Sequence, residues 1–371
     1  MSGCLNLDTF IIPGHSGDFF PETPEDYLKI LKSDFVYDWP ARLDIDITNR
    51  CNHICHFCFS KTYRLSSPEC SMGFPIIKKI IKEMVLKGTI SVRFCGGGEP
   101  LMHPEAYNIF KYCLGFPVHI TLLTNGDLFS NEYQRIFLRP FVHLRFSLDS
   151  YNETTRAKLH GTSIHSFNIV VNNITNYNNG RYKESIVQST KVGVTYLLHP
   201  LNIDGICNIS EKMKNIGVDY ITFRLIKGNI SIIFSAEELK RLVDNFRKAK
   251  HKYEDEAFKL FFPTDFNRTT FSPHSVFDKC LVSRVRTMIE ANGNVQMCPK
   301  GRGGISWKTI GNIIQESSFV SIWNVNKRSI QFQRAPKECV ECLDYSSNKT
   351  LNGLLNHIYN GEIIEFLRLE K

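Results

Sequence analysis

The stretch RLDIDITNRCNHICHFCFS, residues 42–60, joins two patterns that decide the fold of this 371-residue chain. Its first part alternates apolar and polar residues, which predicts a β-strand over residues 42–48. Its second part places Cys51, Cys55 and Cys58 directly after that strand, with the spacing C-x3-C-x2-C. Loops that follow parallel strands build the active sites of α/β folds. The stretch therefore predicts a site of clustered thiols at the end of the first strand of such a fold.

Strand and helix patterns continue to alternate after this stretch. Further strands are predicted at 89–94, 119–124, 142–148, 191–198 and 218–225, and helices at 74–88, 103–115 and 203–217. Another helical region follows residue 148 and ends near the polar segment NYNNGRYKES (176–185), which predicts a loop. Ser235 and Glu238 form a capping-box pattern that opens a helix reaching about Lys250. Six strands alternating with helices predict right-handed parallel βα units, wound either as a doubly wound sheet or as a barrel.

The pattern changes after residue 250, and we expect four regions. These are an N-terminal lead-in over residues 1–40, the α/β unit over 41–250, a smaller domain over 251–350 and a closing helix within 351–371. Inside the smaller domain, MIEANGNVQMC (288–298) predicts a β-hairpin with an Asn292-Gly293 turn. The hairpin would deliver Cys298 near the end of its second strand.

Composition excludes several classes of partner. The net charge is +8, but the basic residues are scattered, and no apolar window is long enough to cross a bilayer. The N-terminus has neither the basic region nor the apolar region of a signal peptide. We therefore expect a cytoplasmic protein with neither a nucleic acid nor a membrane as partner. In a reducing compartment, clustered cysteines more often bind metal than form disulfides.

Two of the cysteine groups suit metal chemistry. The three thiols of the first group could hold zinc only with a fourth ligand, which His53 or His56 would have to supply. They could instead hold a [4Fe–4S] cluster with one iron left open. The second group supplies four thiols, a number that suits both zinc and a fully ligated [4Fe–4S] cluster. Its members are Cys280, Cys298, Cys339 and Cys342.

The first group, with Phe57 directly before its last cysteine, resembles the signature of the radical S-adenosylmethionine (SAM) superfamily. FCGGGEP (94–100) resembles the Gly-Gly-Glu-Pro segment of that family, LLTNG (122–126) resembles the end of its third strand, and RFSLDS (145–150) lies where the family contacts SAM. The resemblance implies a partial (β/α)6 barrel and a [4Fe–4S] cluster on the three cysteines, with SAM bound at the open iron. It makes His53 and His56 solvated loop residues. It implies SAM-binding roles for Phe57, Gly96, Gly97, Gly98, Glu99, Asn125, Ser147, Asp149 and Arg224.

The second group resembles the twitch domain, a shortened form of the SPASM iron–sulfur domain. Cys280 and Cys298 flank Gly293 with the spacing of that domain, and Cys339 and Cys342 form the later C-x2-C pair. The resemblance implies a second [4Fe–4S] cluster, held by four thiolates and used for electron transfer.

Together the resemblances imply a radical SAM enzyme. Reductive cleavage of SAM, with a one-electron donor such as flavodoxin or ferredoxin, would give a 5′-deoxyadenosyl radical that abstracts hydrogen from a carbon. We expect a small-molecule substrate such as a sugar, nucleoside or aminocyclitol, because the lead-in is shorter than a peptide-recognition domain. The alternatives are oxidation, cross-linking or epimerisation of a ribosomally made peptide or protein side chain, and a non-catalytic iron–sulfur or zinc protein. Cys95 is a hydrogen-donor candidate, although a core role suits it better.

Overall fold

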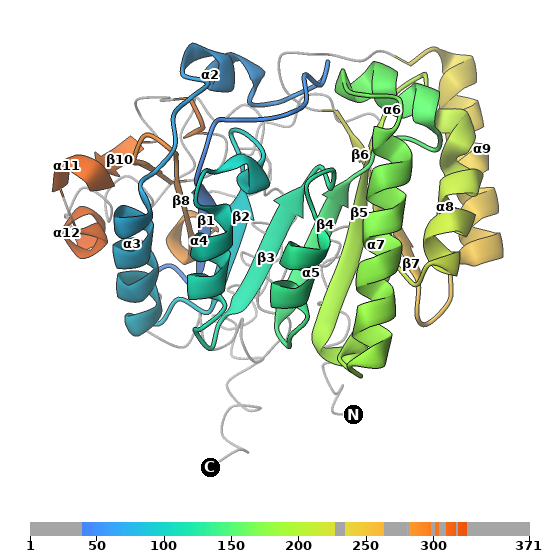
Figure 1. Ribbon diagram of the computed structural model, residues 1–371. Coiled ribbons are helices and arrows are strands. Elements are labelled where there is room, and N and C mark those ends of the chain that lie inside the picture. The colour runs from blue at the N-terminus through green and yellow to red at the C-terminus, as the bar shows by residue number, and fades with distance from the viewer. Residues whose placement is uncertain are drawn as a thin grey trace, which may run out of the picture.

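One sheet carries the fold. The computed structural model describes residues 39–226, 234–262, 280, 282–297, 301–303, 309–316 and 318–324. Within them, ten strands form a single sheet in the order β10-β9-β8-β1-β2-β3-β4-β5-β6-β7 (Figure 1). The strands from β8 to β7 in this order are parallel, and β9 and β10 extend the β8 edge in antiparallel fashion. The alternating α/β architecture predicted from the sequence is confirmed.

The bounds of the elements are as follows. The strands are β1 (Arg42–Asp46), β2 (Ser91–Cys95), β3 (His119–Thr124), β4 (Val142–Ser147), β5 (Thr190–Leu198), β6 (Tyr220–Leu225), β7 (Lys259–Phe261), β8 (Arg286–Ile289), β9 (Asn294–Gln296) and β10 (Thr309–Asn312). The α-helices are α2 (Lys61–Ser66), α3 (Phe74–Leu86), α4 (Ala106–Cys113), α5 (Asn131–Phe137), α6 (Glu153–His160), α7 (Ser166–Lys183), α8 (Ile206–Asn215), α9 (Ala236–Tyr253), α10 (Val282–Val285), α11 (Ile313–Glu316) and α12 (Phe319–Asn324). The 3₁₀ helices are η2 (Pro100–Met102), η3 (Val187–Ser189) and η4 (Ile203–Gly205).

The two faces of the sheet differ in chemistry. Successive side chains of a strand point to opposite faces. Leu43 and Ile45 belong to the apolar core, and Phe94 of β2 packs edge to face on Phe110 of α4. Figure 1 shows α3, α4, α5 and α7 covering one face of the sheet. The central strands are therefore buried on both sides, with apolar residues toward these helices and polar residues on the opposite face.

A buried ion cluster occupies the polar face. The carboxylate of Asp44 accepts hydrogen bonds from Arg42 (2.9 Å), Arg93 (2.6 Å) and Arg286 (2.6 Å), which lie on three adjacent strands. Burial raises the pKa of Asp44, but the guanidinium groups of Arg286, Arg42 and Arg93 outweigh burial and hold this pKa well below its ordinary value. The cluster ties β8, which comes late in the chain, to β1 and β2.

The hairpin prediction is confirmed. Strands β8 and β9 pair antiparallel, and Gly293 in their turn has a φ of +86°, a left-handed conformation that favours glycine. The hairpin also pairs with β1 through β8, so it continues the main sheet. The division of the chain into four regions stays a prediction. Residues 1–38 of the predicted lead-in, the closing helix and Cys298, Cys339 and Cys342 lie outside the described residues.

The prediction of a loop at residues 176–185 was wrong, because α7 continues through most of this polar segment. Gly180 leaves room for Leu138, whose Cδ1 would lie 2.8 Å from a Cβ at that position. Buried Arg181 donates hydrogen bonds to Thr190, Asn178 and Asp219. The polar residues are thus held in a helix by tertiary contacts that the local pattern does not show.

Strand β7 was not predicted. The capping box at the start of α9 is confirmed: the Glu238 amide donates to the Ser235 hydroxyl, and the Ser235 amide donates to the Glu238 carboxylate.

None of the helices in the described residues is long and apolar enough to cross a membrane.

A glycine on β5 permits a contact between its two neighbouring strands. The Tyr220 side chain crosses from β6 over Gly193, and its hydroxyl lies 2.7 Å from Nε2 of His143 on β4. A Cβ on Gly193 would overlap the Tyr220 ring.

We expect Gly193→Ala to lower the free energy of unfolding by about 1–3 kcal/mol, the usual cost of overpacking. Urea unfolding measures this. Gly73→Ala is the matched control, because its nearest neighbour would be 3.8 Å away, and we expect a change below about 0.5 kcal/mol. Equal losses in the two variants would contradict the prediction.

Candidate functional site

The predicted cysteine ligands lie together on the loop between β1 and α2. Cys51, Cys55 and Cys58 are half-buried and free of disulfides. The backbone amide of Cys58 donates to the carbonyl of Cys55 (3.3 Å), which folds the loop on itself. Burial raises the pKa of Cys51 to about 11, and the thiol of Cys58 adds to the rise. Burial also raises the pKa of Cys55, to which both other thiols contribute. The three thiols are therefore close enough to influence one another.

The end of α6 holds this loop in place. The amides of Ile54 and His56 donate to the carbonyls of His160 (3.0 Å) and Leu159 (3.2 Å). Gly161 caps the helix with a φ of +56°, and a Cβ there would lie 2.6 Å from the carbonyl oxygen of Ile54. Glycine is needed at this position both for its conformation and for the close approach of the two backbones.

The glycine segment after β2 packs against the other side of the cysteine loop. The amides of Gly98 and Glu99 donate to the carbonyls of Thr48 (2.9 Å) and Arg50 (2.7 Å). A Cβ on Gly97 would overlap the side chain of Asn49, and one on Gly98 would overlap the backbone of Arg50. A Cβ on Gly96 would overlap Gly98 itself. These glycines allow two loops to meet, and their approach to SAM stays a prediction.

Glu99 joins the ends of β2 and β3. Its buried carboxylate accepts hydrogen bonds from the Thr124 hydroxyl (2.8 Å), the Asn125 amide (2.7 Å) and the Leu101 amide (3.2 Å). Burial raises the pKa of Glu99 to about 7, although these hydrogen bonds oppose the rise. The Asn125 side chain also donates to Asn52 on the cysteine loop (2.7 Å).

The raised pKa of Glu99 predicts a pH dependence of stability. Between the ordinary pKa of 4.5 and the folded-state pKa of about 7, the folded chain binds more protons than the unfolded chain. The contribution of Glu99 to the free energy of unfolding therefore falls as pH rises through this window, by on the order of 3 kcal/mol, and is level above it. We expect Glu99→Gln to remove this contribution, which urea unfolding of both proteins at pH 5 and pH 8 would measure. The prediction would be contradicted if the free energy of unfolding changed by the same amount between pH 5 and pH 8 in wild type and in Glu99→Gln.

The predicted residues after β4 are held by an arginine that the sequence did not reveal. Arg156, fully buried on α6, donates to the carbonyls of Ser147 (2.7 Å), Leu148 (2.8 Å) and Asn125 (2.7 Å). It thereby fixes the ends of β3 and β4. Asp149 has a φ of +52° and accepts a hydrogen bond from the Leu197 amide (2.6 Å). Burial raises the pKa of Asp149 to about 7.

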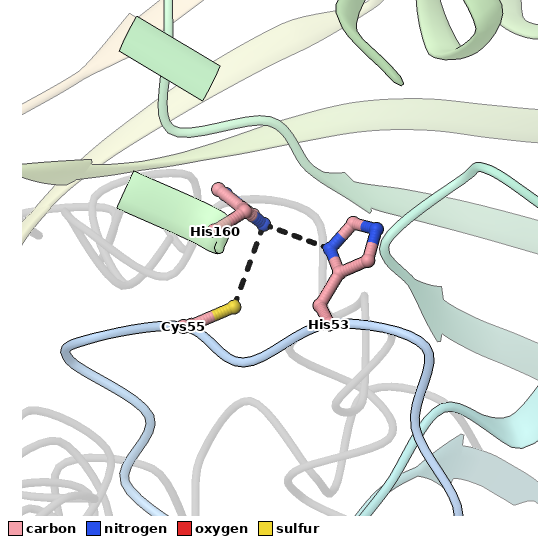
Figure 2. A group of neighbouring side chains, drawn as sticks. All are labelled: His53, Cys55 and His160. Carbon is pink, nitrogen blue, oxygen red and sulfur yellow. Dashed lines mark hydrogen bonds between the residues drawn. The ribbon is translucent and has the colours of Figure 1, made fainter. Parts of the chain in front are cut away.

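His53 is not the solvated loop residue that the resemblance implied. Its side chain is 1% exposed, and its Nε2 lies 2.8 Å from a carboxylate oxygen of Asp127. Its Nδ1 lies 3.2 Å from Nδ1 of His160, which in turn lies 3.5 Å from the sulfur of Cys55 (Figure 2). Phe57 is buried and packs edge to face on His160. His56 is exposed, as expected. His160 and Asp127 were missed because nothing in the sequence distinguishes them from other polar residues. The i,i+4 spacing of Arg156 and His160 places them on one helix face but does not indicate a site.

Cys95 is the last residue of β2 and lies on the polar face of the sheet, opposite Asp46 of β1. Its sulfur lies 3.4 Å from Asp46 and 3.8 Å from Arg302, and burial raises its pKa to about 12. Arg302 binds Asp46 with two hydrogen bonds (2.6 and 2.9 Å), which joins the segment after the hairpin to the end of β1. Arg224 lies at the end of β6, half-buried. Cys95 is thus buried beside an ion pair, and its role, structural or hydrogen-donating, stays a prediction.

The donor set of the loop fits the cluster that the resemblance implied. Three thiols come from one loop, as a [4Fe–4S] cluster with an open iron needs. Three predicted SAM contacts follow the carboxyl ends of the adjacent strands β2, β3 and β4. They are Glu99, Asn125 and Asp149. Of the second group of cysteines, the described residues include Cys280, which is half-buried and precedes α10.

Comparisons with known proteins agree with this arrangement. The radical SAM superfamily model matches residues 45–213, and the SPASM iron-sulfur cluster-binding domain matches residues 280–343. A probable GTP 3′,8-cyclase of Methanocaldococcus jannaschii is 28% identical over 253 residues, which are 62% of this chain and 78% of that protein. The mycofactocin maturase MftC of Mycolicibacterium smegmatis is 22% identical over 322 residues, 82% of this chain and 76% of that protein. The crystal structure of Streptococcus suis SuiB bound to the precursor peptide SuiA has a TM-score of 0.62 at 16% identity, covering 83% of this chain and 70% of that chain.

Proposed function

We propose that this chain, which belongs to the radical SAM superfamily and carries a SPASM-type iron–sulfur domain, is an enzyme that modifies a ribosomally made peptide or protein side chain. Its cofactors are SAM and two iron–sulfur clusters. The sequence alone favours a small-molecule substrate, with the peptide as the alternative. The comparisons support the peptide better.

The observation that carries the proposal is the extent of the similarity to a peptide maturase. The match to mycofactocin maturase covers 82% of this chain, enough to extend from the radical SAM region into the SPASM region. The fold shared with SuiB, which was crystallised with its precursor peptide, covers a similar share. A nucleotide is the second candidate substrate, favoured by the higher identity to the GTP 3′,8-cyclase over a shorter stretch.

The residues of this chain have separable tasks in such an enzyme. When bound, SAM and its cluster supply a radical that can abstract hydrogen from a carbon of the substrate. Cys51, Cys55 and Cys58 would hold that cluster, while Gly161 and the carbonyl of His160 keep their loop against α6. Glu99 and Arg156 fix the strand ends from which the SAM contacts are expected to come. The electron would come from a one-electron donor such as flavodoxin or ferredoxin.

A substrate assay tests the proposal. The full chain, reconstituted anaerobically with iron and sulfide, is incubated with SAM, dithionite and short peptides encoded beside its gene. We expect a mass change in one peptide, together with 5′-deoxyadenosine, and neither when SAM is omitted. Parallel reactions contain GTP or sugars. If 5′-deoxyadenosine and a modified product formed with GTP, and no product formed with any peptide, the substrate would be a nucleotide and the peptide proposal would be wrong.

A further inference from the structure

Three metal-binding side chains converge where the cysteine loop meets the end of α6. They are His53 and Cys55 from the loop and His160 from the helix (Figure 2). One ligand atom from each lies within 4.8 Å of the other two. Nδ1 of His160 lies 3.2 Å from Nδ1 of His53 and 3.5 Å from the sulfur of Cys55. Both histidines are buried, so their orientation is fixed by the protein.

The two distances from Nδ1 of His160 match edges of a tetrahedral metal site. Zinc binds nitrogen at about 2.0–2.1 Å and sulfur at about 2.3 Å. In a tetrahedron with these bond lengths, two nitrogens are separated by about 3.3 Å, and a nitrogen and a sulfur by about 3.5 Å. The observed separations of 3.2 and 3.5 Å therefore match two edges of such a tetrahedron, and the third edge, between His53 and Cys55, is no longer than 4.8 Å.

The outer nitrogens of both histidines face carboxylates. Nε2 of His53 lies 2.8 Å from Asp127, and Nε2 of His160 lies 3.1 Å from Asp149 and 3.4 Å from a guanidinium nitrogen of Arg156. A histidine that binds metal commonly donates its other N–H to a carboxylate in this way. If both Nε2–H groups donate to these carboxylates, two Nδ1 lone pairs face each other at 3.2 Å. A cation between them turns that repulsion into two bonds.

We propose that His53, Cys55 and His160 form a mononuclear site for a divalent transition metal of the zinc type, with its fourth position open. Cys55 loses its thiol proton to solvent when it binds the metal. Because the same sulfur is a predicted ligand of the SAM-binding cluster, the single metal and that cluster exclude each other. Zinc at this site blocks cluster loading. This inference does not depend on the identity of the substrate.

Zinc titration of the full-length chain, stripped of metal under anaerobic conditions, tests the site. The four distal cysteines can also bind zinc, so the readout is the difference between wild type and variants against a competing chelator. We expect His160→Leu and, separately, His53→Leu to lose one equivalent of tightly bound zinc. Asp127→Asn should weaken this equivalent by about 10–100-fold, as loss of an outer carboxylate does. His165→Ala, which removes an exposed histidine close to α6, should change nothing.

Cys51→Ser distinguishes zinc bound at His53, Cys55 and His160 from zinc bound by the three cysteines of the loop. We expect Cys51→Ser to keep the equivalent that His160→Leu loses. Loss with Cys51→Ser and retention in both histidine variants would overturn the proposal. Reconstitution provides a second measurement. Two equivalents of zinc added first, enough for this site and for the four distal cysteines, should lower the iron content of wild type by about eight per chain, the content of two clusters. The same zinc should lower the iron content of His160→Leu by only about four per chain, and an equal loss in both proteins would also overturn the proposal. Circular dichroism of each variant verifies that it is folded.

Discussion

Replacing Cys51 with serine is expected to abolish turnover and to remove one of the two clusters. A [4Fe–4S] cluster needs its three thiolates from this loop, and a serine hydroxyl is a poor replacement for a thiolate toward iron. Iron should fall from about eight to about four per reconstituted chain. Formation of 5′-deoxyadenosine from SAM and dithionite should fall to the level seen without protein. Iron analysis and chromatography of the reaction measure the two effects.

Cys207→Ser is the matched control for this substitution. Cys207 is a half-exposed cysteine on α8, distant in sequence from both cysteine groups, and its sulfur contacts the carbonyl of Asn245 (3.5 Å), which a serine hydroxyl can also reach. We expect both clusters and full 5′-deoxyadenosine formation. If Cys51→Ser retained eight irons and its activity, the assignment of the loop as the SAM-binding site would be wrong.

The largest effect on stability is expected at Asp44. Asp44→Ala removes the carboxylate shared by Arg42, Arg93 and Arg286 and leaves three positive charges close together in the core. Breaking a buried ion pair in this way costs about 3–5 kcal/mol. Because the pKa of Asp44 is lowered in the folded state, its contribution is present above the ordinary pKa of 3.8 and is lost as pH falls below it. Urea unfolding at pH 7 measures the loss.

An exposed aspartate provides the comparison for Asp44. Asp204 pairs with Arg241 at 3.3 Å, and both side chains are about half exposed. We expect Asp204→Ala to cost less than about 1 kcal/mol, because solvent screens exposed pairs. Similar losses for the two substitutions would show that Asp44 does not hold the arginine cluster together.

Local patterns were enough to predict most of the fold. The alternation in β1, the capping box of Ser235 and the Asn292-Gly293 turn each depend on residues close in sequence, and each appears in the structure as predicted. The helix α7 was cut short because Asn and Gly near residue 180 disfavour helix, whereas the contacts that hold it come from Leu138 and Asp219. Strand β7 has three residues and lacks a recognisable pattern.

The candidate site was predicted only as far as its motifs extend. The cysteine spacing and the glycine segment are contiguous and therefore visible in the sequence. The partners that fix them cannot be seen in the sequence. Asp127, Arg156 and His160 follow Cys55 by 72 to 105 positions, and only the fold brings them together. His53 was predicted to be a solvated loop residue because the family resemblance takes its ligands from the three cysteines and leaves the histidines of the loop without a role. Its burial against Asp127 requires the end of β3, which lies far along the chain.

The pairing of β1 with β8 has a consequence for how the chain is made. Asp44 and Arg286 are 242 positions apart, so one edge of β1 has no partner from β8 until that much more of the polypeptide has been synthesised. At about 5–20 residues per second, a ribosome needs roughly 10–50 seconds for this. An unpaired strand edge is a template for other chains during that interval. Nascent molecules that stall before the hairpin emerges are therefore the ones most exposed to aggregation, and the ones for which a chaperone would matter most.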